Sequence, residues 1–208
     1  MTVLDKLASS LDRRDEIPNQ ELAREIVTTE DEEAVTELMG LLNHKDKAVL
    51  HDCIKVLYEI GEQRPQLIAK HWKRFLTLLE HKDNRLQWGA MTALGTIARE
   101  RPKEIHAKLP LIMDAADKGS VITRDHAVNI LIQLAAFPKY AKNAFALLNE
   151  QLLKSPVNQL PMYAERSLPI ITDHNKTRFV DTLQLRLKEV EKESRRKRIE
   201  KVLKKVMK

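Results

Sequence analysis

The sequence predicts an all-α fold in which pairs of helices stack in series. Composition is the first indication, because the 208 residues include only 5 Gly and 8 Pro, with 43% hydrophobic and 32% charged residues, a balance typical of helical proteins. A repeat of 37 residues is the second, because Leu41–Asp46 returns as Leu78–Asp83 and Ile60–Pro65 returns as Ile97–Pro102. The third is the helical spacing of apolar residues within each copy.

Each copy reads as two helices joined by a polar turn. Asp46 and Asp83 fall in these turns, where we expect them to cap the second helix, and His44 and His81 occupy matching positions beside them. Pro65 closes the first pair, because proline cannot continue the helix that precedes it. The apolar positions of the first copy are Val35, Leu38, Met39 and Leu42, then Cys53, Val56, Leu57 and Ile60.

Three columns at the same step extend the repeat to four copies. Two columns are apolar, and the third is small, as two helices require where their backbones approach closely. Pro161 and Pro169 fall on the second helix of the fourth copy, so we expect that helix to start late and to be kinked. The columns are Leu57, Leu94, Leu131 and Leu168; Ile60, Ile97, Leu134 and Ile171; and Cys53, Ala90, Ala127 and Ala164.

The segments outside the repeats read as end caps of a single solenoid domain spanning residues 1–208. Residues 1–29 are expected to form capping helices at about 2–14 and 19–29, and residues 30–174 the four repeats. Residues 175–208 are expected to form one long basic helix from about Asn175. Caps of this kind cover the open ends of a stacked array.

The third copy carries a resemblance to a known family. Leu109–Met113, followed by Val121, Arg124, Ala127, Val128 and Leu131, resembles the HEAT repeat of the armadillo-like α-solenoids, and the likeness covers about residues 30–175. It implies a right-handed α-α superhelix of about four helix-pair repeats. Asp46, Asp83 and Arg124 match the family's Asp and Arg that link neighbouring repeats, whereas Leu50 and Gln87 stand in the Arg column. Armadillo repeats, with a third helix per unit, fit this period less well.

The resemblance also implies a binding surface, because second helices line the concave side of HEAT-like rods. Trp88 is the most informative residue there, since a solvent-facing aromatic anchors partner chains or nucleobases; the alternative is that it packs over Gly89. Trp72 falls in a core column and reads as structural. The expected partner-binding residues are His51, Lys55, Trp88, Thr92, Arg124, Asp125, Asn129 and Arg166.

Charge is distributed unevenly. Residues 1–46 hold five basic and twelve acidic residues, a balance of −7, and residues 184–208 hold eleven and four, a balance of +7. Ile199, Val202, Leu203 and Val206 recur at helical spacing in the tail, which predicts an amphipathic helix that either binds a polyanion or caps the last repeat. Its basic residues are Arg195, Arg196, Lys197, Arg198, Lys201, Lys204 and Lys205.

Several kinds of chemistry lack support. The histidines and the single cysteine, Cys53, show no metal-ligand spacing, so neither a metal nor a cofactor is expected. The inter-helix turns explain His44 and His81. Phosphate-binding glycine loops and nucleophile elbows are absent from the sequence, which disfavours nucleotide and ester hydrolysis.

Two functional hypotheses follow. The first is a non-enzymatic, cytoplasmic scaffold that binds a protein or peptide on the second helices. The second is nucleic-acid binding, including the alkylpurine DNA glycosylases built on HEAT-like repeats, with Trp88 and Asp125 in one column. The acidic run Glu30–Glu33 and the basic run Arg195–Arg198 also suggest weak head-to-tail association. A secretory signal and a membrane span are not expected.

Overall fold

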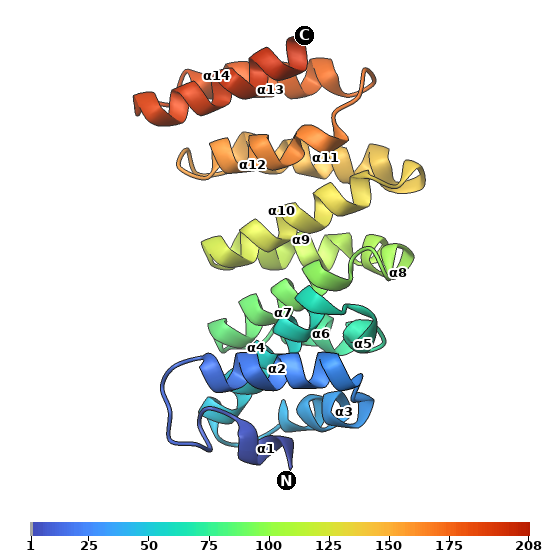
Figure 1. The fold of residues 1–208 in the computed structure, drawn as a ribbon. Helices are drawn as coiled ribbons and strands as arrows, with labels where there is room; N and C mark the ends of the chain where they lie inside the picture. The colour runs from blue at the N-terminus through green and yellow to red at the C-terminus, as the bar shows by residue number, and fades with distance from the viewer. Residues whose placement is uncertain (1) are drawn as a thin grey trace. The chain divides into compact units, whose positions relative to one another are not determined.

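The computed structural model describes residues 2–208, and within them the regular elements are α-helices and one 3-10 helix (Figure 1). An all-α fold is therefore confirmed. The elements are α1 (Val3–Lys6), α2 (Ile17–Thr29), α3 (Glu32–Leu41), α4 (Lys47–Gln63), α5 (Gln66–Ala69), α6 (Trp72–Leu78), α7 (Asn84–Ile97), α8 (Pro102–Ala107), α9 (Leu109–Lys118), α10 (Val121–Ala135), α11 (Pro138–Lys154), α12 (Leu160–Ser167), η1 (Leu168–Ile170), α13 (Lys176–Leu187) and α14 (Glu193–Met207).

The chain divides into two compact units, and each is described by itself. Unit 1 comprises Met1–Ala127 and unit 2 comprises Val128–Lys208. The prediction of one domain over residues 1–208 stays a prediction. No helix in the described part of the chain is long and apolar enough to cross a membrane.

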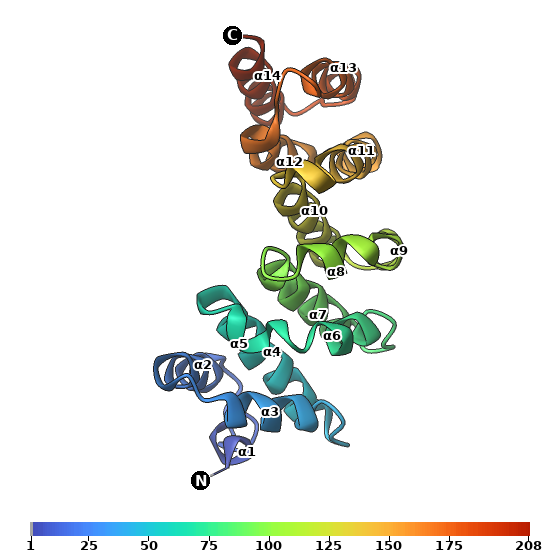
Figure 2. The same ribbon diagram turned by 90° about the vertical axis from the view of Figure 1, so that its right-hand side faces the viewer.

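The core of unit 1 lies between its second helices and follows the 37-residue columns. The two views show α4 and α7 side by side (Figures 1 and 2). Cys53, Leu57 and Ile60 on α4 are fully buried, as are their counterparts Ala90, Leu94 and Ile97 on α7. A close approach of the two helices is seen at Gly89, where an added Cβ would lie 2.6 Å from Ile54 Cγ1. Glycine is needed there because a methyl group would overlap the neighbouring helix.

The turns before α4 and α7 have the same construction. The Asp46 carboxylate accepts a hydrogen bond from the Ala48 N–H, and Asp83 accepts from the N–H groups of Arg85 and Leu86. His44 Nδ1 accepts from the Asp46 N–H at 3.1 Å, and His81 Nδ1 from the Asp83 N–H at 3.0 Å. The predicted capping and turn roles of these residues are confirmed.

The second and third repeats contain a third helix. After Pro65 the chain forms α5 before α6, and Pro102 opens α8 before α9. The preference for helix pairs over three-helix units is therefore wrong at these two repeats. The physical reason is the proline, which starts a short helix that ends before the main first helix begins.

The N-terminal cap differs from expectation in its first helix. α1 is only four residues long, in place of a helix at 2–14, whereas α2 is present. Side chains hold the turn that follows α1: the buried Asn19 Oδ1 accepts from the Ala8 N–H, and Asp52 on α4 accepts from the Ser9 N–H. These long-range bonds replace the helical bonds of the expected segment.

In unit 2 the prolines shape the fourth copy. Pro161 lies in the first turn of α12, so the expected late start is confirmed. In place of the expected kink, the α-helix ends at Ser167 and is followed by η1, which contains Pro169. Ala164 is fully buried, but Leu168 and Ile171 are only half-buried. The two apolar columns therefore fail at their fourth member, because the helix has ended before Ile171.

The single long helix expected from about Asn175 is instead two helices, α13 and α14, separated at residues 188–192. The apolar stripe of α14 is buried at Ile199, Val202 and Leu203, and α14 lies beside α12. The stripe therefore completes the core of unit 2, which agrees with the capping interpretation of the tail.

Candidate functional site

The strongest cluster of polar groups in unit 1 surrounds Lys55. Its side chain is 8% exposed, and its ammonium bonds to Glu59 Oε1 at 2.6 Å and to Glu16 Oε2 at 2.9 Å. The Lys55 nitrogen also lies 5.0 Å from the centre of the Tyr58 ring. Burial lowers the pKa of Lys55, but the hydrogen bonds to Glu59, Glu16 and Tyr58 outweigh it and raise the pKa above its usual range. Lys55 therefore stays charged.

Glu16, which caps α2, joins a second cation in the same cluster. Its Oε1 accepts from Arg85 Nη2 at 3.0 Å, and Arg85 lies in the first turn of α7. One carboxylate thus bridges Lys55 on α4 and Arg85 on α7. We call these three residues the clamp. Arg85 Nε is buried and has no hydrogen-bond partner among the described residues.

An aromatic pair borders the clamp. The rings of Tyr58 on α4 and Trp88 on α7 lie 5.8 Å apart between centroids and are tilted by 48°, a geometry that aromatic pairs favour. Tyr58 is buried, whereas Trp88 is half-buried and retains solvent-facing area. Trp88 is one helical turn from Arg85, so both side chains lie on the same side of α7.

His51 links the first two repeats. His51 Nε2 lies 3.0 Å from both carboxylate oxygens of Asp83. Burial raises the pKa of Asp83, but the bonds from His51 and the backbone outweigh it, so the pKa lies below its ordinary value. Arg124 forms no ion pair with an aspartate in residues 2–208; its Nη2 donates to the Asp117 carbonyl at 3.4 Å. The link expected of the Asp–Arg match is therefore made by His51 and Asp83.

The structure brings together three of the expected partner-binding residues, His51, Lys55 and Trp88, on α4 and α7. Thr92 is buried, and its hydroxyl donates to the Trp88 carbonyl at 2.9 Å. Arg124 and Asp125 are half-buried at the start of α10. Asn129 and Arg166 belong to unit 2, where Asn129 is half-buried and Arg166 is exposed.

Sequence reasoning missed Glu16, Arg85 and Tyr58. Glu16 lies outside the 37-residue repeats, so no repeat column identifies it. The sequence signal at this place is only the acidic excess of residues 1–46, which hold twelve acidic and five basic residues.

Trp72, expected to be structural, is half-buried and lines a groove of about 360 Å³ with Leu76 and Leu111.

Two of the four acids in the run Glu30–Glu33 form ion pairs within unit 1. Glu30 pairs with Arg64 at 2.8 Å, Glu32 pairs with Lys70, and Asp31 caps α3. The head-to-tail contact suggested by the sequence stays a prediction.

The basic tail is partly neutralised in the same way. Arg198 forms a two-point ion pair with Glu165 on α12, at 2.8 and 2.6 Å. Arg196 contacts Glu200 at 3.4 Å and donates to the Leu187 carbonyl, and Lys197 lies 3.4 Å from Glu193. In the described chain no ion pair involves the remaining predicted tail residues, Arg195, Lys201, Lys204 and Lys205.

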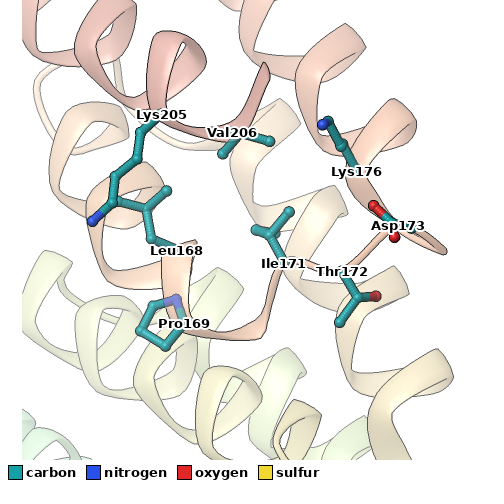
Figure 3. Close-up of a pocket in the computed structure, with 8 residues that line it drawn as sticks. All are labelled: Leu168, Pro169, Ile171, Thr172, Asp173, Lys176, Lys205 and Val206. Carbon is teal, nitrogen blue, oxygen red and sulfur yellow. The ribbon is translucent and has the colours of Figure 1, made fainter. Parts of the chain in front are cut away.

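Unit 2 has an open groove of about 550 Å³ where η1, the loop to α13 and the end of α14 meet (Figure 3). Leu168, Ile171 and Val206 supply apolar surface, and the amines of Lys176 and Lys205 lie on opposite sides. The groove exists because Pro169 ends the helix, which leaves Leu168 and Ile171 only half-buried.

Thiol and metal chemistry find no support in the described residues. Burial, together with the nearby Asp52 and Glu37, raises the pKa of the Cys53 thiol to about 12, so it stays protonated at neutral pH. Residues 2–208 contain no group of three or more His, Cys, Asp or Glu side chains placed to hold a metal ion.

Comparison with known proteins identifies the fold. No protein-family model matches the chain, and no curated protein matches it. An engineered protein of known structure aligns with a TM-score of 0.63 and 22% identity over 99% of both chains. A designed armadillo repeat protein in complex with the peptide (KR)4 aligns with a TM-score of 0.67 and 16% identity, covering 91% of this chain and 87% of that one.

A computationally designed armadillo repeat protein for modular peptide recognition aligns with a TM-score of 0.64 and 17% identity, covering 97% of each chain. Identities this low show the fold alone. The resemblance drawn from the sequence is confirmed at that level: the chain has an armadillo-like helical-repeat fold.

Proposed function

We propose that this chain is a non-enzymatic scaffold that binds a protein or peptide segment across α4 and α7. The observation that carries the proposal is Trp88, a half-buried aromatic whose ring contacts Tyr58 beside charged groups that are already fixed in place. Such a residue offers a large rigid contact area at low entropic cost, which is the usual property of an interface anchor.

The fold supports the proposal by analogy. One structural neighbour is described as bound to the peptide (KR)4, and another as designed for modular peptide recognition. Those descriptions concern the neighbours. For this chain the argument rests on Trp88 and on the two helices that hold it.

The test is selection of binding peptides from a displayed random dodecapeptide library, followed by fluorescence anisotropy with Trp88→Ala. We expect the selected peptides to lose at least about tenfold in affinity, because truncating an anchor typically costs more than about 1–2 kcal/mol. Leu185→Ala is the matched control, since Leu185 on α13 is an exposed apolar residue of unit 2. Unchanged binding by Trp88→Ala, or no selected peptide, would contradict the proposal.

Nucleic-acid binding is the second candidate, and the charge of unit 2 favours it. Unit 2 holds 17 basic and 8 acidic residues, a balance of +9, and Lys201, Lys204 and Lys205 are exposed on α14. An electrophoretic shift assay at low salt tests it, with these three lysines changed to Gln so that the apolar stripe of α14 stays in place. Binding that weakens steeply with salt and is lost in the triple variant supports this candidate; no shift for the wild-type chain rejects it.

A further inference from the structure

The clamp of Glu16, Lys55 and Arg85 is built to hold a carboxylate that comes from outside α4 and α7. Lys55 and Arg85 belong to neighbouring repeats, and each bonds to a different oxygen of Glu16. Glu59, on the same helix as Lys55, neutralises only one of the two cations. A second carboxylate is therefore required for balance, because an unpaired, partly buried cation is costly.

The chain on either side of Glu16 is held by contacts that do not involve Glu16. Asn19 accepts from the Ala8 N–H and Asp52 from the Ser9 N–H, whereas Leu11 and Ile17 are 50% and 49% exposed. Asp12 adopts a left-handed backbone conformation with φ of 52°, and Arg13 pairs with Asp15 inside the same segment. The Glu16 side chain itself is 46% exposed, whereas that of Lys55 is 8% exposed. Withdrawing Glu16 thus disturbs little of the core.

The clamp also has an unused donor. Arg85 binds Glu16 through Nη2, while its buried Nε has no hydrogen-bond partner in the described chain. A guanidinium binds a carboxylate best through two parallel N–H donors. A ligand carboxylate that uses both Nε and Nη2 would satisfy the donor that Glu16 leaves free.

We propose that the partner segment is acidic: one of its carboxylates replaces Glu16 between Lys55 and Arg85, and a neighbouring aromatic or apolar side chain packs on Trp88. Glu16 then acts as an internal competitor that occupies the clamp in the free chain. This inference rests on the proposed function, because it names the chemistry of the peptide that the α4 and α7 surface binds.

Geometry sets the spacing of the two ligand groups. Arg85 and Trp88 are three residues apart on α7, so their Cβ atoms lie about 5–6 Å apart. In an extended peptide, residues i and i+2 point to the same side, and at about 3.3 Å per residue they lie roughly 7 Å apart. An acid followed two residues later by an aromatic therefore matches the clamp and Trp88.

Other acids near the clamp restrict this preference to one position. Asp83 is paired with His51, and Glu59 with Lys55. Glu62 is exposed one turn beyond Glu59 on α4, seven residues or about 10 Å along the helix from Lys55. The carboxylate preference applies at Lys55 and Arg85 and not along the whole of α4.

The experiment uses three fluorescein-labelled peptides, Gly-Ser-Glu-Ser-Phe-Ser-Gly and its counterparts with Gln or Lys in place of Glu, and measures fluorescence anisotropy with the full chain. We expect the Glu peptide to bind most tightly. Glu16→Gln should tighten its binding about fivefold to tenfold, because the competitor is gone, and leave binding of the Gln peptide nearly unchanged. Glu21→Gln is the matched control, since Glu21 is an exposed acid on α2 that is not part of the clamp.

Arg85 provides the second arm. Arg85→Gln should weaken the Glu peptide about tenfold, and Arg85→Lys, which keeps the charge without the fork, should weaken it less. The inference would be overturned if the Lys peptide bound more tightly than the Glu peptide, or if the Glu peptide bound Glu16→Gln more weakly than the wild type. In either case the proposed function would still stand if binding depended on Trp88. Failure of all three peptides to bind would also overturn it, and the proposed function would still be decided by its own library.

Discussion

The two units of this chain differ in how strictly they follow the repeat. In unit 1 the columns through Leu57, Leu94 and their neighbours are fully buried, the charge balance is −3 from 19 basic and 22 acidic residues, and His51 and Asp83 join the first two repeats. In unit 2 Pro169 interrupts the same columns, Leu168 and Ile171 become half-buried, and the balance is +9. Where the repeat is unbroken, the column residues are buried in a core. Where Pro169 ends the helix, the column residues Leu168 and Ile171 line a groove instead.

The largest expected effect tests the columns directly. Leu94→Ala should reduce the free energy of unfolding of unit 1 by about 2–5 kcal/mol, because it leaves a cavity in a fully buried site. Leu168→Ala, at the equivalent position of unit 2, should cost less than half of that. Urea unfolding measures both: tryptophan fluorescence reports unit 1, which holds Trp72 and Trp88, and circular dichroism reports all helices. Equal losses would mean that the two units pack their columns alike.

The next effect belongs to unit 2. Arg186 on α13 is 5% exposed and donates to the carbonyls of Leu152, Leu153 and Ser155 at the end of α11, which satisfies groups that a helix end leaves unpaired. Arg186→Met should destabilise unit 2 by about 2–3 kcal/mol, since hydrogen bonds to a charged group are lost in a buried place. The dichroism transition should move to lower urea while tryptophan fluorescence does not.

Arg178→Met is the control for this change, because Arg178 lies on the same helix and is exposed. If Arg186→Met shifted the tryptophan transition as far as the dichroism transition, the two units would unfold together. Their stabilities could then not be compared separately.

Much of the fold could be predicted from the sequence, because the buried apolar residues recur at the same spacing in each repeat. The caps at Asp46 and Asp83 were predictable for a similar reason, since a turn has local chemistry. The division of the tail into α13 and α14 was not, because residues 188–192 contain neither Gly nor Pro. The break there depends instead on contacts such as that of Arg196 with the Leu187 carbonyl.

The candidate site was only half predictable. Trp88 and Lys55 fall in columns, so the repeat placed them on neighbouring helices. Glu16 reaches Arg85 across 69 residues of sequence, and a pairing of that range leaves no local pattern. The burial of Lys55 was also missed, because periodicity assigned its position to solvent whereas Glu16 and Tyr58 cover it.

Loss of the contact between His51 and Asp83, which links the first two repeats, should have a smaller effect on stability. Asp83→Ala should cost about 1–2 kcal/mol, because Asp83 both caps α7 and binds His51. Asp46→Ala is the matched variant, since Asp46 caps α4 through a similar bond to the Ala48 N–H, and it should cost less. Thermal unfolding followed by tryptophan fluorescence compares the two.

The pH dependence of stability provides a second test of Asp83. The pKa of Asp83 is lowered in the folded chain, so its contribution is present above its ordinary value near 3.8 and is lost as the pH falls through the lower folded value. The stability of Asp83→Ala should therefore depend less on pH in that range than that of the wild type. Identical pH profiles would remove the argument for the His51 link.

The smallest effect concerns the pair that ties α14 to α12. Glu165 and Arg198 are 40% and 47% exposed, so solvent screens them and Glu165→Gln should cost only about 0.5 kcal/mol despite its two-point geometry. The bonds from Arg198 lower the pKa of Glu165 against a smaller opposing effect of burial, so the contribution is present above its ordinary value near 4.5 and is lost at more acidic pH. The dichroism midpoints of wild type and Glu165→Gln should differ at pH 7 and converge at low pH. A difference that persists in acid would mean that Glu165 holds α14 through packing rather than through its charge.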